Sequence, residues 1–67
     1  MQLTVNGQPR TFDRPVLTVA DVIRELALEG KRIAVEMNGE IVPRSRYAGT
    51  AVDSSDRLEI VGAVGGG

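Results

Sequence analysis

Residues 18–26 read TVADVIREL, and this is the one stretch of the chain with clear helical spacing. Apolar residues at i, i+3, i+4 and i+7 place four aliphatic side chains on one helical face. Thr18 can cap the helix, Asp21 lies in the first turn where the helix dipole favours an anion, and Gly30 is a stop signal. We predict a helix over residues 19–29 that covers a sheet, with docking into a partner's groove as the alternative. The four side chains are Val19, Val22, Ile23 and Leu26.

Two Asn-Gly dipeptides lie on either side of this helix, each between short runs with strand-like alternation. Asn-Gly readily adopts the positive φ angles of a two-residue hairpin turn. Pro9 cannot donate to a strand ladder, so the strand that contains it suits a sheet edge. The sequence therefore predicts a β-hairpin before the helix and another after it. The expected strands are residues 2–5, 8–12, 33–37 and 40–42.

The last third of the chain supplies one further strand. Residues 44–49 are expected to form an irregular or single-turn helical connector in which Tyr47 packs, and residues 50–52 allow another short strand. Residues 57–61 form the final strand. The resulting order, β-β-α-β-β-β, predicts an α+β fold with one helix on one face of a mixed sheet. First and last strands can pair in parallel at the centre because a long crossover joins them, which is the ubiquitin-like β-grasp arrangement.

Composition excludes several classes of function. The chain has 67 residues, one Phe, one Tyr and no Trp, which predicts a single small domain with an aliphatic core and without a roomy ligand cavity. It has no Cys and no His, so we expect no metal, no cofactor and no self-contained catalysis. The net charge of −1 does not favour nucleic-acid binding. Neither a signal peptide nor a membrane span is indicated, and we expect a cytoplasmic protein.

The chain ends on Gly65-Gly66-Gly67, which suggests a task for the terminus. We expect residues 1–62 to form the β-grasp domain and residues 63–67 to form a flexible tail. Glycine lacks a Cβ, so such a tail is thin enough to thread into a partner's active site. The reactive group would be the α-carboxylate of Gly67, which is ionised at neutral pH and is a poor electrophile until a leaving group is attached. A frayed end or a cloning remnant is the alternative.

Other residues offer weaker candidates. If Leu58 and Ile60 face the helix, then the open face of the sheet presents Val61, which with Ala63 and Val64 makes an apolar docking surface. Packing of Val61 against neighbouring strands is the alternative. Arg44 and Arg46 suit either an acidic partner or simple solvation. Asp13, Asp53 and Asp56 are imaginable metal ligands, but they lie in turns where Asp commonly accepts hydrogen bonds from its own backbone.

Three segments resemble the ubiquitin-like sulfur carriers, and among these the ThiS family of thiamine biosynthesis. They are residues 3–7, residues 35–44 with Tyr47 behind them, and residues 58–67. The resemblance implies that a ThiF-like enzyme adenylates Gly67 and that sulfur from a persulfide donor then gives a thiocarboxylate. A ThiG-like thiazole synthase would receive that sulfur. Gly66 and Gly67 match the terminal pair of the family, whereas Gly65 carries less weight.

Two alternatives remain open at this stage. One is that the chain delivers sulfur to molybdopterin synthase or to another thiolation pathway, or is conjugated to other proteins as ubiquitin is. In a different class of function, it would be a binding or regulatory module that uses the open sheet face and never modifies Gly67.

Overall fold

The computed structural model describes residues 1–62; the predicted tail, with Ala63, Val64, Gly65, Gly66 and Gly67, lies outside the described residues. Five strands, one α-helix and one 3₁₀-helix follow one another in this described part, in the predicted order. They are β1 (Gln2–Val5), β2 (Gln8–Thr11), α1 (Val19–Glu25), β3 (Ile33–Met37), β4 (Glu40–Val42), η1 (Arg44–Gly49) and β5 (Arg57–Gly62).

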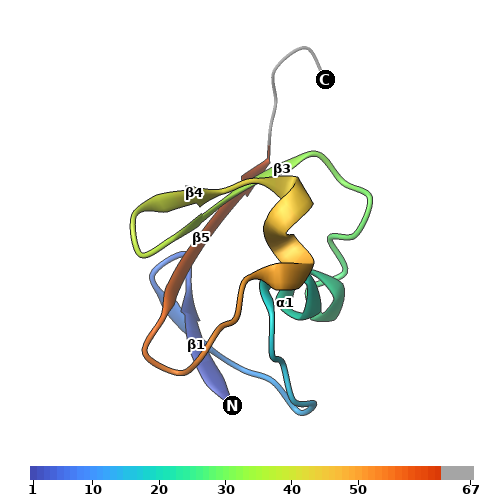
Figure 1. Cartoon of the computed structure of the whole chain (residues 1–67). Helices are drawn as coiled ribbons and strands as arrows, with labels where there is room; N and C mark the ends of the chain where they lie inside the picture. Colours follow the sequence, from blue (N-terminus) through green and yellow to red (C-terminus); the bar gives the residue numbers. More distant parts are fainter. Residues whose placement is uncertain (63–67) are drawn as a thin grey trace.

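The strands form one mixed sheet in the order β2-β1-β5-β3-β4. β1 and β5 pair in parallel at the centre, and the other neighbours are antiparallel. α1 and η1 lie on the same side of the sheet (Figure 1). The predicted α+β class, the β-grasp topology and the edge position of the Pro9 strand are therefore confirmed.

Both hairpins turn at the predicted Asn-Gly dipeptides. The φ angles are +53° and +78° at Asn6 and Gly7, and +54° and +87° at Asn38 and Gly39. Two consecutive positive φ angles give a turn whose twist matches that of the flanking strands. The turn thereby fixes the register of each hairpin.

The core lies between the sheet and α1 and is almost wholly aliphatic. Val19, Val22 and Ile23 of α1 are buried as predicted, while Leu26 is half-buried and packs against the same cluster. Tyr47 of η1 packs at its margin, also as predicted. The buried residues are Leu3, Val5, Phe12, Val16, Val19, Val22, Ile23, Val35, Val42, Val52, Leu58 and Ile60.

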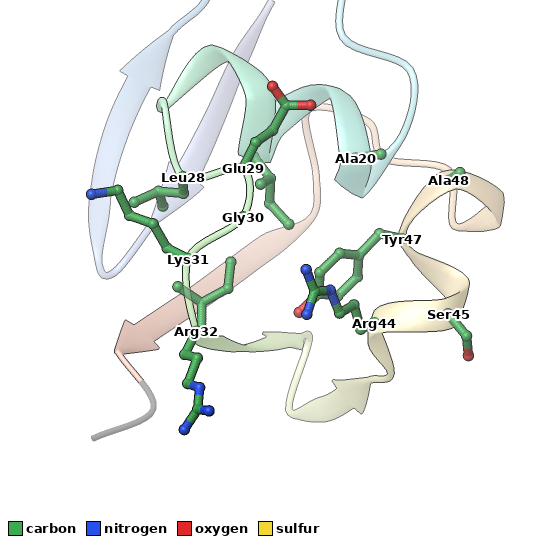
Figure 2. A pocket seen from close by; sticks show the side chains of 12 residues that line it. Ala20, Leu28, Glu29, Gly30, Lys31, Arg32, Arg44, Ser45, Tyr47 and Ala48 are labelled. Carbon is green, nitrogen blue, oxygen red and sulfur yellow. The ribbon is translucent and has the colours of Figure 1, made fainter. Parts of the chain in front are cut away.

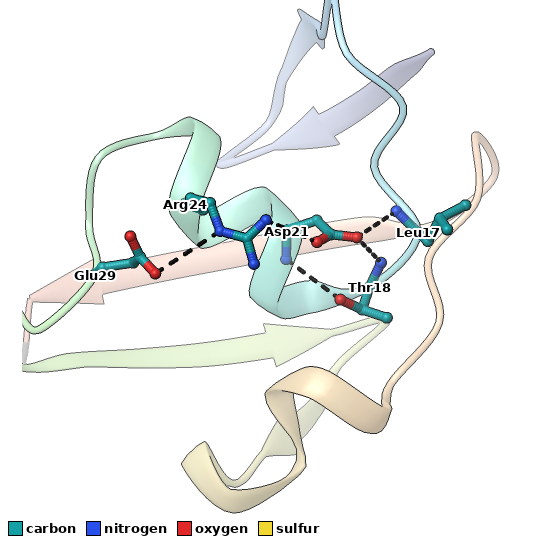
Figure 3. Close-up of polar contacts among 5 residues, drawn as sticks. All are labelled: Leu17, Thr18, Asp21, Arg24 and Glu29. Carbon is teal, nitrogen blue, oxygen red and sulfur yellow. Dashed lines mark hydrogen bonds and ion pairs between the residues drawn. The ribbon is translucent and has the colours of Figure 1, made fainter.

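Two residues, Thr18 and Asp21, cap the N-terminus of α1 reciprocally (Figure 3). The Thr18 hydroxyl accepts a hydrogen bond from the backbone N–H of Asp21 at 3.3 Å. In return, a carboxylate oxygen of Asp21 accepts from the backbone N–H groups of Thr18 at 3.1 Å and Leu17 at 2.8 Å. These bonds, the Leu17 bond first, lower the pKa of Asp21 below its ordinary value. The predicted N-terminus is confirmed, and it is a reciprocal capping box.

The end of α1 corrects the prediction, because the helix stops at Glu25 and not at residue 29. Ala27 takes a left-handed φ of +59°. Its N–H donates to the Arg24 carbonyl at 3.0 Å, and the N–H of Leu28 donates to the Ile23 carbonyl at 2.9 Å. These two bonds form a Schellman motif, in which the left-handed position usually holds glycine. Gly30 has a positive φ of +75° but lies beyond the helix, in the following turn.

Smaller differences concern strand ends. Phe12 leaves β2 and turns into the core, and β5 extends one residue beyond the prediction, to Gly62. Residues 50–52 form a single antiparallel bridge, Ala51 with Thr18, and not a strand. This bridge ties the entrance of α1 to the segment after η1, since the Val19 N–H donates to the Thr50 carbonyl at 2.9 Å.

Candidate functional site

The candidate site begins where β5 ends, at the last described residues before the predicted tail. β5 is the central strand, so it has a neighbour on either side. On the β3 side the register continues to the end of the strand, with Ala34 opposite Val61 and Ile33 opposite Gly62. The chain is therefore held in the sheet up to the residue that precedes Ala63.

On the β1 side, the Asn6 side chain continues the pairing after β1 has turned away. Its amide nitrogen donates to the Ile60 carbonyl at 3.0 Å, and its amide oxygen accepts from the Ile60 N–H at 2.7 Å. One primary amide thus satisfies both polar backbone groups of a buried residue 54 positions away. Sequence analysis assigned Asn6 to the turn alone and missed this second contact, because nothing local in the sequence signals it.

The second turn asparagine holds the other end of β5. The amide oxygen of Asn38 accepts from the Arg57 N–H at 2.9 Å, and its nitrogen donates to a carboxylate oxygen of Asp56 at 2.9 Å. Asp53 accepts from the hydroxyl and the N–H of Ser55, which lowers the pKa of Asp53. Asp53 and Asp56 therefore organise the turn before β5, as their position in the sequence indicated.

Val61 lies on the sheet face opposite α1 and is 58% exposed. Leu58 and Ile60, which alternate with it, are buried beneath the helix, as predicted. Val61 is therefore not part of the buried core, and its cross-strand neighbour on this face is Ala34. The other two residues assigned to partner docking, Ala63 and Val64, lie outside the described residues, as does the terminal glycine triplet.

Exposed neighbours enlarge the face around Val61. Ala34 is its cross-strand partner, and Ile41 of β4, 75% exposed, is in register with Glu36 of β3. Glu36 is in turn opposite Glu59 of β5. We call these five residues the open face; it carries aliphatic side chains together with two carboxylates. Only the Val61 part of it was assigned a role from the sequence.

A hollow on the other side of the sheet was not expected from composition (Figure 2). It has a volume of about 440 Å³ and lies between the end of α1, the loop that follows, and η1. Ile23, Ile33 and Tyr47 supply its apolar wall. Charged residues of both signs border it, namely Glu29, Lys31, Arg32 and Arg44. The loop after α1 contributes Leu28 and Gly30 to its lining. Arg46 does not line it.

The described part of the chain offers little else for chemistry. In residues 1–62, no three or more Asp or Glu side chains gather so that they could hold a metal ion. Within that range, too, no helix is sufficiently long and apolar to cross a membrane. What the described part of the site offers is therefore a strand end that is paired up to Gly62 and an exposed face beside it.

Comparisons with known proteins agree with this anatomy. A model of the ThiS family matches residues 3–67. The chain is 35% identical to the sulfur carrier protein ThiS of Bacillus subtilis, over 97% of this chain and 98% of that one. The crystal structure of the thiamine biosynthesis protein ThiS from Geobacter metallireducens superposes with a TM-score of 0.84 at 36% identity, with full coverage of both chains.

Another relative is much longer. The chain is 46% identical to a thiazole synthase of Paramagnetospirillum magneticum over all of its 67 residues, but spans only 20% of that protein's length. The remaining four-fifths of that protein have no counterpart in this chain.

Proposed function

The chain belongs to the ThiS family, and from that premise we propose that it is a sulfur carrier of thiamine biosynthesis which works through its terminal carboxylate. The observation that carries the proposal is the family match, which runs through Gly67. The structure supports it in one respect, since β5 is paired with β3 up to Gly62. A tail that starts from such a fixed point delivers its end to a defined place in a partner.

A carboxylate has no good leaving group, so the acyl carbon of Gly67 must be activated before sulfur can be added. A ThiF-like enzyme transfers AMP from ATP to the Gly67 carboxylate, and pyrophosphate leaves. The acyl carbon then carries a good leaving group. A persulfide sulfur attacks that carbon and expels AMP, and cleavage of the S–S bond by a thiol leaves the thiocarboxylate. An unhindered glycine lets successive active sites reach the same atom.

The carrier itself contributes geometry and no catalysis. Catalytic groups come from the partners, because this chain has neither the thiolate nor the imidazole that nucleophilic catalysis commonly uses. Residues 63–67, fully extended, reach about 17 Å beyond the sheet. This is long enough to thread Gly65, Gly66 and Gly67 into a partner while the folded body stays outside. Val61, with Ala63 and Val64, contacts the partner at the entrance.

We take the recipient of the sulfur to be a ThiG-like thiazole synthase. The relative in Paramagnetospirillum magneticum supports this choice, because the matching sequence there lies within a protein named thiazole synthase. A cytoplasmic location follows from the same proposal, since adenylation requires ATP.

Intact-mass measurement tests the carrier chemistry. After incubation with ATP, the adenylating enzyme and a persulfide donor, the chain is expected to gain the mass difference between sulfur and oxygen. A variant with one alanine appended after Gly67 is the control and is expected to stay unmodified. An unchanged mass for the parent chain, with an adenylating enzyme that is active on another carrier, would refute the proposal.

A further inference from the structure

The two hairpin turns, Asn6-Gly7 and Asn38-Gly39, have the same sequence and the same left-handed backbone conformation. In such a dipeptide, the backbone nitrogen that follows asparagine can attack the side-chain amide carbon, because glycine has no Cβ to hinder the approach. Both glycines also have open space where a Cβ would stand. The two turns therefore share one chemical reactivity, and what differs between them is the surroundings of the asparagine side chain.

The reaction is deamidation, and it consumes only water. The glycine nitrogen loses its proton and forms a bond to the amide carbon, while the bond from that carbon to the side-chain nitrogen breaks. Ammonia leaves, and a five-membered succinimide ring remains. Water then opens the ring. Opening at the side-chain carbonyl gives aspartate, whereas opening at the backbone carbonyl gives isoaspartate, whose main chain is longer by one methylene.

At Asn6 the fold opposes this reaction. The amide must leave its hydrogen bonds before it can turn toward the next backbone nitrogen. Both of its partners are backbone groups of Ile60, whose N–H lies at 2.7 Å and whose carbonyl lies at 3.0 Å. Ile60 is buried in β5, the central strand. Release of the amide would leave two polar groups of a buried residue without a partner, which carries a desolvation penalty.

At Asn38 the amide is held by exposed groups. Its oxygen accepts from the Arg57 N–H and its nitrogen donates to a carboxylate oxygen of Asp56, both at 2.9 Å and both in contact with solvent. Asp56 precedes β5 and Arg57 is the first residue of that strand. Water can replace either partner when the amide turns away, so release costs less here than at Asn6.

We propose that Asn38 is a site of spontaneous deamidation in the native protein, and that the two bonds to Ile60 protect Asn6 from the same reaction. The products weaken the β3–β4 turn. An aspartate at position 38 puts a negative charge where the amide nitrogen donated to the Asp56 carboxylate. An isoaspartate adds a methylene to a turn whose two-residue geometry sets the register of the hairpin.

Peptide mapping of the full chain tests the inference. Trypsin cleaves after Arg10, Arg32 and Arg44, so the two asparagines fall in separate peptides, residues 1–10 and 33–44. A converted peptide gains the mass difference between a hydroxyl and an amino group. In the native protein at neutral pH, we expect Asn38 to convert about tenfold faster than Asn6, which corresponds to about 1.4 kcal/mol in the cost of release.

The same chain unfolded in urea is the matched control. Neither amide is held there, so the two sites should convert at rates within about threefold of each other. A native ratio of Asn38 to Asn6 that exceeds the unfolded ratio by about threefold or more supports the inference. A smaller excess, or no conversion at Asn38, overturns it. None of these outcomes depends on whether Gly67 is adenylated.

Two variants extend the test. Asp56→Ala removes the acceptor of the Asn38 amide nitrogen and should speed conversion at Asn38 but not at Asn6. An unchanged rate at Asn38 would contradict control by these hydrogen bonds. Asn38→Asp carries one product uniformly, and its midpoint of thermal unfolding should be lower than that of the parent. An equal or higher midpoint overturns the conclusion that deamidation weakens the turn.

Discussion

At the scale of single residues, Asn6 and Asn38 each combine a turn with a long-range contact. Both have the left-handed φ that a hairpin turn requires, and both bond with their side-chain amides to the backbone of β5. The Asn-Gly dipeptides predict the turns. They do not predict the hydrogen bonds of the side-chain amides to β5, because those depend on which strand the topology places beside each turn.

Asn6→Gly separates these two roles. Glycine keeps the positive φ of the turn but removes both hydrogen bonds to Ile60, whose backbone is buried. Loss of two such bonds should lower the free energy of unfolding by about 1–3 kcal/mol. Chemical denaturation measures this. Asn38→Gly removes exposed bonds of the same kind and serves as the comparison; an equal or larger loss there would contradict the special role of Asn6.

Asp21 predicts a pH dependence of stability. Its native pKa lies below its ordinary value of 3.8, first because of the Leu17 N–H and then through Thr18 and Arg24. A lowered carboxylate pKa stabilises the native state above the ordinary pKa, and this contribution is lost as the pH falls through the native pKa. Asp21→Asn should therefore be less stable than the parent at pH 7, with a difference that narrows below about pH 4.

Denaturation curves of the parent and Asp21→Asn between neutral and acid pH check this prediction. Asp13→Asn is the control, because the Asp13 side chain forms no hydrogen bond within residues 1–62. A difference for Asp21→Asn that stays constant down to about pH 2 would show that the carboxylate charge is not the cause.

At the scale of elements, the end of α1 shows where sequence patterns fail. The apolar face and the cap at Thr18 predicted where the helix starts and what it buries. Its end was predicted four residues too late, because Ala27 is by itself an excellent helix former and gives no stop signal. The Schellman bonds to Ile23 and Arg24 mark the end in the structure, and they require a left-handed φ at Ala27 that no glycine or asparagine there announces. The hollow beside η1 lies next to this end and was not predicted either.

Ala27→Gly should stabilise the protein. A left-handed conformation costs an L-residue with a Cβ roughly 1–2 kcal/mol, and glycine avoids that cost but loses more chain entropy on folding. The net gain in free energy of unfolding should be about 0.5–1 kcal/mol. Ala20 has helical backbone geometry in α1, so Ala20→Gly should lower the free energy of unfolding and serves as the control. Thermal unfolding of both variants decides the matter, and a loss at residue 27 would contradict the left-handed geometry.

At the scale of the whole molecule, the two sides of the sheet differ in chemistry. The helix side holds the core and a hollow bordered by charged residues of both signs, whereas the open side carries exposed aliphatic side chains beside Glu36 and Glu59. The alternation of β5 predicted which of its residues face the helix, and Val61 was found exposed accordingly. The facing carboxylates were not predicted, because this cross-strand pair depends on the register between Glu36 and Glu59, which are 23 residues apart in sequence.

Residues 1–62 should fold without residues 63–67. Among residues 1–62, the core cluster joins α1 to the sheet, and β5 is paired with β3 up to Gly62. A chain that stops after Gly62 should therefore keep its free energy of unfolding within about 0.5 kcal/mol of the full chain, as is usual for changes away from core, caps and buried bonds. The same chain should not be adenylated, because the acceptor carboxylate would then belong to a residue held in the sheet. Chemical denaturation and ATP–pyrophosphate exchange on the one preparation measure both properties. A large loss of stability would mean that residues 63–67 are part of the folded unit, and such a contact would hold back the carboxylate that the partner enzymes must reach.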